Sequence, residues 1–214
     1  MMTLTMLSQK GGAGKSTLAL HLACEAVTRG IKVLLLDLDP QGSLASWGSK
    51  RGELPPDVEA VHPSSLAKTL AEAAQDGYDL TVLDTAPSAD RAAMLAAEVA
   101  DLIVVPCRPA TFDIEAIQTT LEVTKLKKRQ AVVVLNAAPI RSKVVDEARS
   151  AIVRAGGIVS PVVVCQRVAY QHCLIDGRTA GEYEPGGAAA DEVTRLLHDM
   201  MTRLQPDTPA WRAV

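Results

Sequence analysis

The sequence predicts an α/β fold: a doubly wound, mostly parallel sheet flanked by helices. Short aliphatic runs alternate with segments of helical periodicity along nearly the whole chain. Two of these runs, KVLLLDLD at 32–39 and LIVVP at 102–106, are apolar almost throughout rather than at alternate positions, as expected of strands covered on both faces. Gly30 and Gly77 stand where helical patterns end.

Each element is predicted from its local pattern. A strand is expected where aliphatic and β-branched residues lie between turn residues. A helix is expected where apolar residues recur three or four positions apart, as Leu18, Leu22 and Ala26 do. The predicted strands are 4–8, 32–39, 58–63 (at an edge), 80–84, 102–106, 131–136 and 162–165. The predicted helices are 15–29, 43–49, 65–77, 89–99, 113–127, 142–155, 168–176 and 188–204.

Length and composition fit one domain. The chain has 214 residues, 48% hydrophobic and 3% aromatic, enough for one large aliphatic core. We expect a single domain over residues 1–204 and a loose, proline-broken tail at 205–214. Because the glycine-rich segment described below starts within ten residues of the N-terminus, we expect no N-terminal helix-turn-helix domain.

The sequence predicts a cytoplasmic protein. No stretch approaches the ~18 consecutive apolar residues of a membrane span, and no basic region followed by an apolar one opens the chain. The four cysteines show no C-x-x-C spacing, which favours reduced thiols packed in the interior.

Charge is unevenly distributed along the chain. Residues 108–178 carry 11 Lys/Arg and 6 Asp/Glu, a net charge of +5, whereas the whole chain has a net charge of −3. Such a basic middle third can bind a polyanion through one face of an acidic protein. A merely solvated surface explains the same distribution equally well.

Residues 9–17, QKGGAGKST, are the most informative segment. They vary the phosphate-binding consensus G-x-x-x-x-G-K-[ST], since Gln9 stands where the first glycine is usual and Lys10 follows it. Glycines let consecutive backbone N–H groups converge on phosphate oxygens, and the helix N-terminus that follows favours anions. Lys15 would reach the β- and γ-phosphates, and the Ser16 hydroxyl would ligate Mg²⁺. The segment predicts a loop that binds ATP or ADP with Mg²⁺.

Acidic residues follow two other predicted strands. Strand 32–39 ends in Asp37-Leu38-Asp39, and strand 80–84 ends in Asp84. Ligands of such sheets bind at the carboxyl ends of the strands, so we expect these carboxylates near the phosphates, with Asp84 holding the Mg²⁺ hydration shell. Asp37 and Asp39 point to opposite faces of an extended chain. One can approach the metal while the other orients an attacking water; turn or capping roles are the alternative.

Four segments together resemble the ParA family of partition ATPases, P-loop NTPases with a deviant Walker A motif: QKGGAGKST, LLLDLDPQGS, LTVLDTAPS and EYEPGGAAADEV. The likeness runs from about residue 4 to residue 204, and CQRVAYQHCLIDG at 165–177 is similar to the small ParF-like branch. It implies a Mg²⁺-dependent ATPase that dimerises on ATP, binds DNA non-specifically and segregates plasmids. A small centromere-binding protein that stimulates hydrolysis would reset it.

The resemblance also implies roles for individual residues. It gives Lys10 a contact with the nucleotide of the partner subunit and Asp39 the orientation of water, with Lys15 as the third catalytic residue. Ser16, Asp37 and Asp84 go with Mg²⁺, and Asn136, at the end of strand 131–136, contacts the adenine edge. The implied nucleotide-binding residues are Gly11, Gly12, Ala13, Gly14, Lys15, Ser16, Thr17 and Asn136.

A physical argument supports the contact of Lys10 across a dimer. Two subunits that face each other across two triphosphates bring dense negative charge together, and a lysine from each partner neutralises it. Since phosphoryl transfer depends on positioning and charge stabilisation, this lysine would make hydrolysis depend on dimerisation. We therefore expect a homodimer in the ATP state, with higher assembly as a further step.

Candidates for DNA binding lie in the basic middle third, because non-specific binding needs phosphate contacts from lysine and arginine. Arg167 matches a family position associated with DNA or partner contact, whereas the cluster 127–129 also fits a solvated helix end. DNA binding would associate the protein with the nucleoid. The candidates are Lys127, Lys128, Arg129, Arg141, Lys143, Arg149, Arg154, Arg167 and Arg178.

Other functions stay open as alternatives. Similar ATPases position chemoreceptor arrays, conjugation complexes or microcompartments. A MinD-like ATPase that cycles on membranes would need a basic amphipathic C-terminal helix, but 196–214 contains Pro206, Pro209 and few basic residues, so no membrane partner is expected. A metabolic P-loop ligase or kinase would need a substrate-binding insertion, which the chain lacks.

The segment VPCRPATFD at 105–113 departs from the family pattern. It keeps Pro106, Pro109 and Asp113 but has Cys107 and Arg108 where smaller or uncharged residues are more common. We expect this loop near the base and the dimer face. An iron–sulfur role for Cys107 is disfavoured, because iron proteins with this P-loop need two cysteines in glycine-rich contexts.

Overall fold

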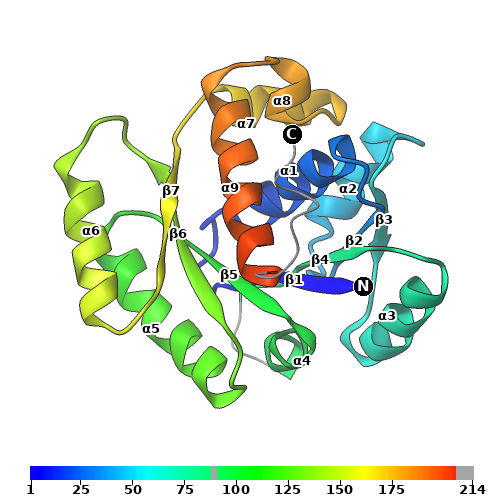
Figure 1. The fold of residues 1–214 in the computed structure, drawn as a ribbon, viewed down its shortest axis with the longest axis horizontal. Helices are drawn as coiled ribbons and strands as arrows, with labels where there is room; N and C mark the ends of the chain where they lie inside the picture. Colours follow the sequence, from blue (N-terminus) through cyan, green and yellow to red (C-terminus); the bar gives the residue numbers. More distant parts are fainter. Residues whose placement is uncertain (88–90, 206–214) are drawn as a thin grey trace.

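The computed structural model describes residues 1–87 and 91–205, in which seven strands form one sheet (Figure 1). The strand order is β3-β2-β4-β1-β5-β6-β7, and each neighbouring pair is parallel, which confirms the predicted fold class. The strands are β1 (Met2–Met6), β2 (Val33–Asp37), β3 (Asp57–Ala60), β4 (Leu80–Asp84), β5 (Leu102–Cys107), β6 (Ala131–Ala138) and β7 (Val159–Cys165).

Helices cover both faces of the sheet, as Figure 1 shows. One face carries α1 (Lys15–Thr28), α2 (Ser43–Arg51), α7 (Ala169–His172), α8 (Ala180–Tyr183) and α9 (Ala188–Leu204). The other carries α3 (Leu66–Gln75), α4 (Arg91–Val99), α5 (Thr111–Leu126) and α6 (Lys143–Arg154). Two 3₁₀ turns complete the described elements, η1 (Pro63–Ser65) and η2 (Cys173–Asp176).

The alternation of side chains along the strands divides the core into two layers. In β2, Leu35 packs with the helices of the α1 face, while Leu34 and Leu36 pack toward α3 and α4. All five residues of β2 are buried. This two-sided burial is the physical reason for the uninterrupted apolar run from which the strand was predicted.

The C-terminal third differs most from the sequence-based prediction. β7 begins at Val159, ahead of Pro161, whereas the prediction began the strand after that proline. Because β7 is an edge strand, Pro161 interrupts no hydrogen bond to a further strand. The helix predicted at 168–176 is a single turn of α7 followed by η2, and α8 was not predicted.

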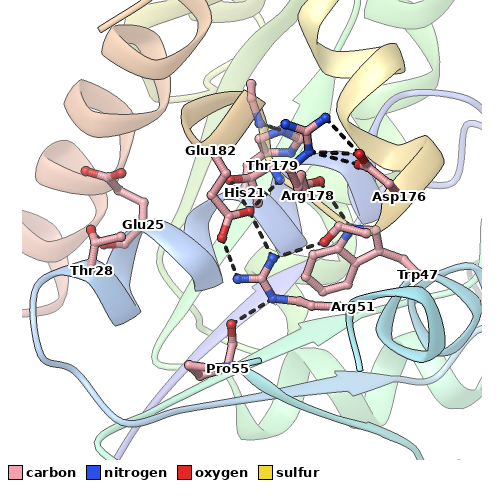
Figure 2. Close-up of polar contacts among 12 residues, drawn as sticks. His21, Glu25, Thr28, Trp47, Arg51, Pro55, Asp176, Arg178, Thr179 and Glu182 are labelled. Carbon is pink, nitrogen blue, oxygen red and sulfur yellow. Dashed lines mark hydrogen bonds and ion pairs between the residues drawn. The ribbon is translucent and has the colours of Figure 1, made fainter. Parts of the chain in front are cut away.

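A polar cluster ties α2 to the segment 176–182 (Figure 2). The Arg51 guanidinium donates two hydrogen bonds to Glu182, at 2.7 and 2.9 Å, and one each to the carbonyls of Gly177 and Pro55. The Trp47 indole donates to the carbonyl of Arg178 at 3.3 Å. Burial tends to raise the pKa of Glu182, but Arg51 and the Thr179 amide together hold it below its usual range. The cluster therefore fixes the C-terminal end of α2.

Two expectations concern residues outside the described ranges. The predicted tail lies there except for Gln205, and so does the first part of the helix predicted at 89–99. Among the described residues, no helix combines the length and the apolar character that crossing a bilayer requires.

Gly177→Ala is expected to destabilise the protein far more than Gly30→Ala. Both glycines have a positive φ, +78° and +76°, so an added methyl group strains both backbones equally. A Cβ on Gly177 would also lie 2.5 Å from the backbone nitrogen of Arg51, whereas a Cβ on Gly30 would meet nothing within 4 Å. We expect Gly177→Ala to lower the free energy of unfolding by about 1–3 kcal/mol more than its control, measured by urea denaturation. Equal losses would contradict the close approach.

Candidate functional site

The glycine-rich loop leaves the centre of the sheet and leads into a helix. It follows β1, which lies between β4 and β5, and ends where Lys15 begins α1. Gly12 and Gly14 adopt φ values of +72° and +99°, a region that glycine enters without steric cost. The loop is thus placed at the N-terminus of a 14-residue helix, where unpaired N–H groups and the helix dipole favour an anion.

Asn136, on β6, holds the loop from a strand that lies two places from β1 in the sheet. Its side-chain amide donates a hydrogen bond of 2.7 Å to the carbonyl of Ala13. The same amide occupies the space into which a Cβ of Gly14 would project. Glycine is therefore needed at position 14 for two reasons: its positive φ, and the lack of room for a side chain. Asn136 was expected, by resemblance, at the adenine edge. In the structure this buried side chain supports the backbone of the loop.

The three aspartates meet at the carboxyl ends of β2 and β4 but differ in their surroundings. In the strand register, Asp37 pairs with Asp84. One oxygen of Asp37 accepts from the amide of Asp39, and the other accepts from the amides of Leu44 and Ala45 at the start of α2. Asp37 therefore caps α2. Asp39 is partly exposed and accepts from the amide of Gln41.

Asp84 is fully buried, and neither of its carboxylate oxygens accepts a hydrogen bond of good geometry from the described residues. Burial raises its pKa to about 7; the nearby Ser16 hydroxyl and the Lys15 ammonium lower it only in part, and the charges of Asp37 and Asp39 raise it further. The Lys15 ammonium is itself largely buried, and this burial lowers its pKa. The negative charges of Asp84 and Asp39 raise that pKa, but by less than burial lowers it.

These groups fit a magnesium–nucleotide complex. Two buried carboxylate oxygens without partners, beside a hydroxyl, match the oxygen ligands and waters that Mg²⁺ takes. Within residues 1–87 and 91–205, no cluster of three or more His, Cys, Asp or Glu could hold a metal by itself. Burial raises the pKa of the Cys107 thiol to about 12, as expected of a cysteine packed in the interior.

A cleft of about 870 Å³ opens beside the loop at the carboxyl edge of the sheet. Lys15, Ser16, Asp39 and Asn136, all predicted site residues, line it. Lys10 is exposed and makes no ion pair with any residue in the described ranges. Trp47 and Lys50 of α2 also line the cleft, and no motif in the sequence predicted their place there.

The nine basic candidates do not form one surface. The cluster 127–129 precedes β6 and Arg154 ends α6, so these residues lie at the amino edge of the sheet, whereas Arg141 and Lys143 follow β6 at the carboxyl edge. The helix α6 of 12 residues, about 18 Å long, separates the two groups. Arg149, partly buried in the middle of α6, donates to the Ser160 carbonyl.

Several candidates are engaged within the protein. Lys127 pairs with Glu98, whose carbonyl also accepts from Arg129. Arg167 pairs at 2.7 Å with Glu192, of which only 4% of the side chain is exposed. Arg178 pairs with Asp176. Candidates that form no ion pair within the described part of the chain are Lys128, Arg141, Lys143, Arg149 and Arg154.

Asp84→Asn is expected to stabilise the nucleotide-free protein at pH 8 but not at pH 4. The folded-state pKa of Asp84, about 7, lies above the ordinary value of 3.8, so the folded state binds the proton more tightly and stability falls as the pH rises between these values. Removing the buried charge should add about 1–3 kcal/mol to the free energy of unfolding at pH 8. Urea denaturation at both pH values measures this. A gain of equal size at pH 4 would contradict the raised pKa.

Comparison with known proteins places this site in a family. The family model described as "CobQ/CobB/MinD/ParA nucleotide binding domain" matches residues 4–180. The chain is 34% identical to Protein ParA of Rhizobium radiobacter, over 79% of this chain and 81% of that protein. It is 29% identical to maintenance of carboxysome distribution protein A of Halothiobacillus neapolitanus, over 93% and 96% of the two chains.

A solved structure shares the fold. The ATP complex of McdA from Cyanothece superposes with a TM-score of 0.73 at 18% identity, over 94% of this chain and 96% of that one. The match of the family model over most of the chain and the identity to Protein ParA agree with the glycine-rich loop and its aspartates. The chain belongs to the CobQ/CobB/MinD/ParA family of nucleotide-binding domains and is a ParA-family ATPase.

Proposed function

We propose that this protein is a Mg²⁺-dependent ATPase that dimerises on ATP, binds DNA non-specifically and partitions DNA such as a plasmid. The observation that carries the proposal is the buried Asp84, whose oxygens accept no hydrogen bond of good geometry from the described residues, next to Lys15 and Ser16. Burying a polar group without hydrogen-bond partners costs free energy unless a ligand supplies those partners. A magnesium-bound triphosphate on the glycine-rich loop would do so.

Each side chain has a distinct part in this proposal. Backbone amides of 11–17 and the Lys15 ammonium would bind the phosphates, and Ser16 with Asp84 would hold the metal. Asp37 would hold the metal less directly, since one of its oxygens already accepts from two amides of α2 and the other from the amide of Asp39. Bound Mg²⁺ would neutralise charge on the phosphate oxygens. Asp39, exposed to the cleft, orients the attacking water.

Lys10 would have a role in the dimer. Its exposed ammonium, unpaired within the described part of the chain, is available to a second subunit. Contact with the partner's nucleotide would neutralise the charge between two triphosphates and couple hydrolysis to the dimer. A small centromere-binding protein would then stimulate hydrolysis and return the protein to the monomer.

The similarity to Protein ParA supports the partition of DNA as the cargo function. A second candidate is the positioning of a microcompartment, which the 29% identity to a carboxysome distribution protein over almost the full chain favours. Gene order separates the two. A small ribbon-helix-helix gene directly downstream would support plasmid partition, and a microcompartment operon would support the second candidate.

Lys10→Ala is expected to bind ATP but not to dimerise, whereas Asp39→Ala should dimerise on ATP and stay dimeric. The first change removes charge needed by the partner's nucleotide, and the second removes only the orientation of water. Light scattering with and without ATP measures dimerisation, and phosphate release measures turnover. A Lys10→Ala protein that dimerises and hydrolyses normally would refute the contact across the dimer.

The double substitution Arg141→Ala and Lys143→Ala is expected to weaken ATP-dependent DNA binding more than the matched pair Lys128→Ala and Arg154→Ala. Only the first pair lies at the edge of the sheet that carries the nucleotide cleft. Removing two phosphate contacts should reduce the slope of log K against log salt by about 1.8. Electrophoretic mobility shifts over a salt series measure the slope. An equal effect of both pairs would contradict this placement.

A further inference from the structure

Arg108 occupies a position beside the glycine-rich loop that no role in the nucleotide site explains. It follows directly after β5, and β5 lies next to β1 in the sheet, with the amide of Leu7 donating to the carbonyl of Val104. One terminal nitrogen of Arg108 lies 3.7 Å from where a Cβ of Gly12 would be. The side chain also lines the cleft that Lys15 and Ser16 line.

The backbone holds Arg108 in a fixed turn. Its carbonyl accepts from the amide of Ala110 at 2.8 Å and from the Cys107 thiol at 3.3 Å. The Ala110 carbonyl in turn accepts hydrogen bonds from the amides of Asp113 and Ile114 in the first turn of α5. The backbone of Arg108 therefore lies between a buried strand and a 16-residue helix. A ligand-binding group is positioned precisely when rigid elements hold it in this way.

The guanidinium of Arg108 is left open to a ligand. It is exposed and forms no ion pair with any residue in 1–87 or 91–205. Arg51, Arg167 and Arg178, by contrast, all pair with carboxylates. An arginine that faces a phosphate-binding loop without a carboxylate partner carries a donor fork suited to phosphate oxygens.

We propose that Arg108 binds the phosphate chain of the nucleotide of its own subunit and stabilises the charge that develops there during hydrolysis. This inference rests on the ATPase function proposed above. In that reaction the water oxygen bonds to the γ-phosphorus, the bond to the bridging oxygen breaks with its electron pair on ADP, and the water proton leaves with phosphate. Arg108 takes no proton; it donates hydrogen bonds to the phosphate oxygens throughout.

An arginine supplied within the same chain raises the basal rate of a P-loop enzyme, because it is present before any stimulating partner binds. Arg108 would thus give this chain a higher turnover without a partner than a chain that has a small or uncharged residue there. The stimulating partner would then add correspondingly less.

The test compares Arg108→Ala, Arg108→Lys and Arg195→Ala, an exposed arginine on α9 that pairs with Asp191 away from the cleft. Turnover is measured by phosphate release, and ATP binding by titration with a fluorescent analogue. We expect Arg108→Ala to lower turnover about tenfold or more and to weaken ATP binding, Arg108→Lys to recover part of the loss, and Arg195→Ala to stay within twofold of the wild type. Free guanidinium, below denaturing concentrations, should raise the turnover of Arg108→Ala and leave that of the wild type unchanged.

Other outcomes are decisive as well. Turnover of Arg108→Ala within twofold of the wild type would overturn the assignment of Arg108. A loss that accompanies a lowered melting temperature and that free guanidinium does not restore would also overturn it, because it would identify Arg108 as a support of the loop. Failure of the wild-type protein to bind or hydrolyse ATP would instead overturn the proposed ATPase function, which separates the two failures.

Discussion

The site depends on the register of three parallel strands. Asp84 of β4 pairs with Met6 of β1 on one side and with Asp37 of β2 on the other. This alignment brings the glycine-rich loop, which leaves β1, next to carboxylates that are far away in sequence. Since successive side chains of a strand alternate between faces, a shift of one residue in either pairing would turn a carboxylate away from the loop. The site is thus a property of the sheet as much as of the motif.

Some polar side-chain atoms buried near the glycine-rich loop have no hydrogen-bond partner in the described residues. Gln9 Nε2 and both oxygens of Asp84 are buried without a hydrogen-bond partner in the described residues, and the Lys15 side chain is buried beside them. Elsewhere in the described residues one further buried side-chain atom has no partner, Thr120 Oγ1 in α5, and the central strands are mostly aliphatic and covered on both faces. Violations of local rules that gather at one place mark functional sites in folded proteins. Here three of the four unpartnered buried atoms in the described residues lie beside the phosphate-binding motif.

The sequence was sufficient for features that depend on local patterns. Apolar runs and helical spacing predicted the parallel sheet, and the spacing within 9–17 predicted the loop. Contacts between distant segments left no such pattern. Asn136 meets Ala13 across 123 positions, and Arg51 meets Glu182 across 131. Pro161 shows the opposite difficulty: the predicted strand began only after it, although on the edge strand β7 this proline lies where the pairing with β6 shifts register.

The attachment of α2 limits how this chain can be recombined with its relatives. Asp37 caps one end of α2, and Arg51 joins the other to the 176–182 segment, where Gly177 lets the two backbones touch. Residues of α2 between these ends line the cleft. A chimera that exchanges the 165–183 region without α2 would therefore lose both the ion pair and the close backbone fit. A chimera would have to exchange α2 and the 165–183 region together, and this exchange would also alter the lining of the nucleotide cleft.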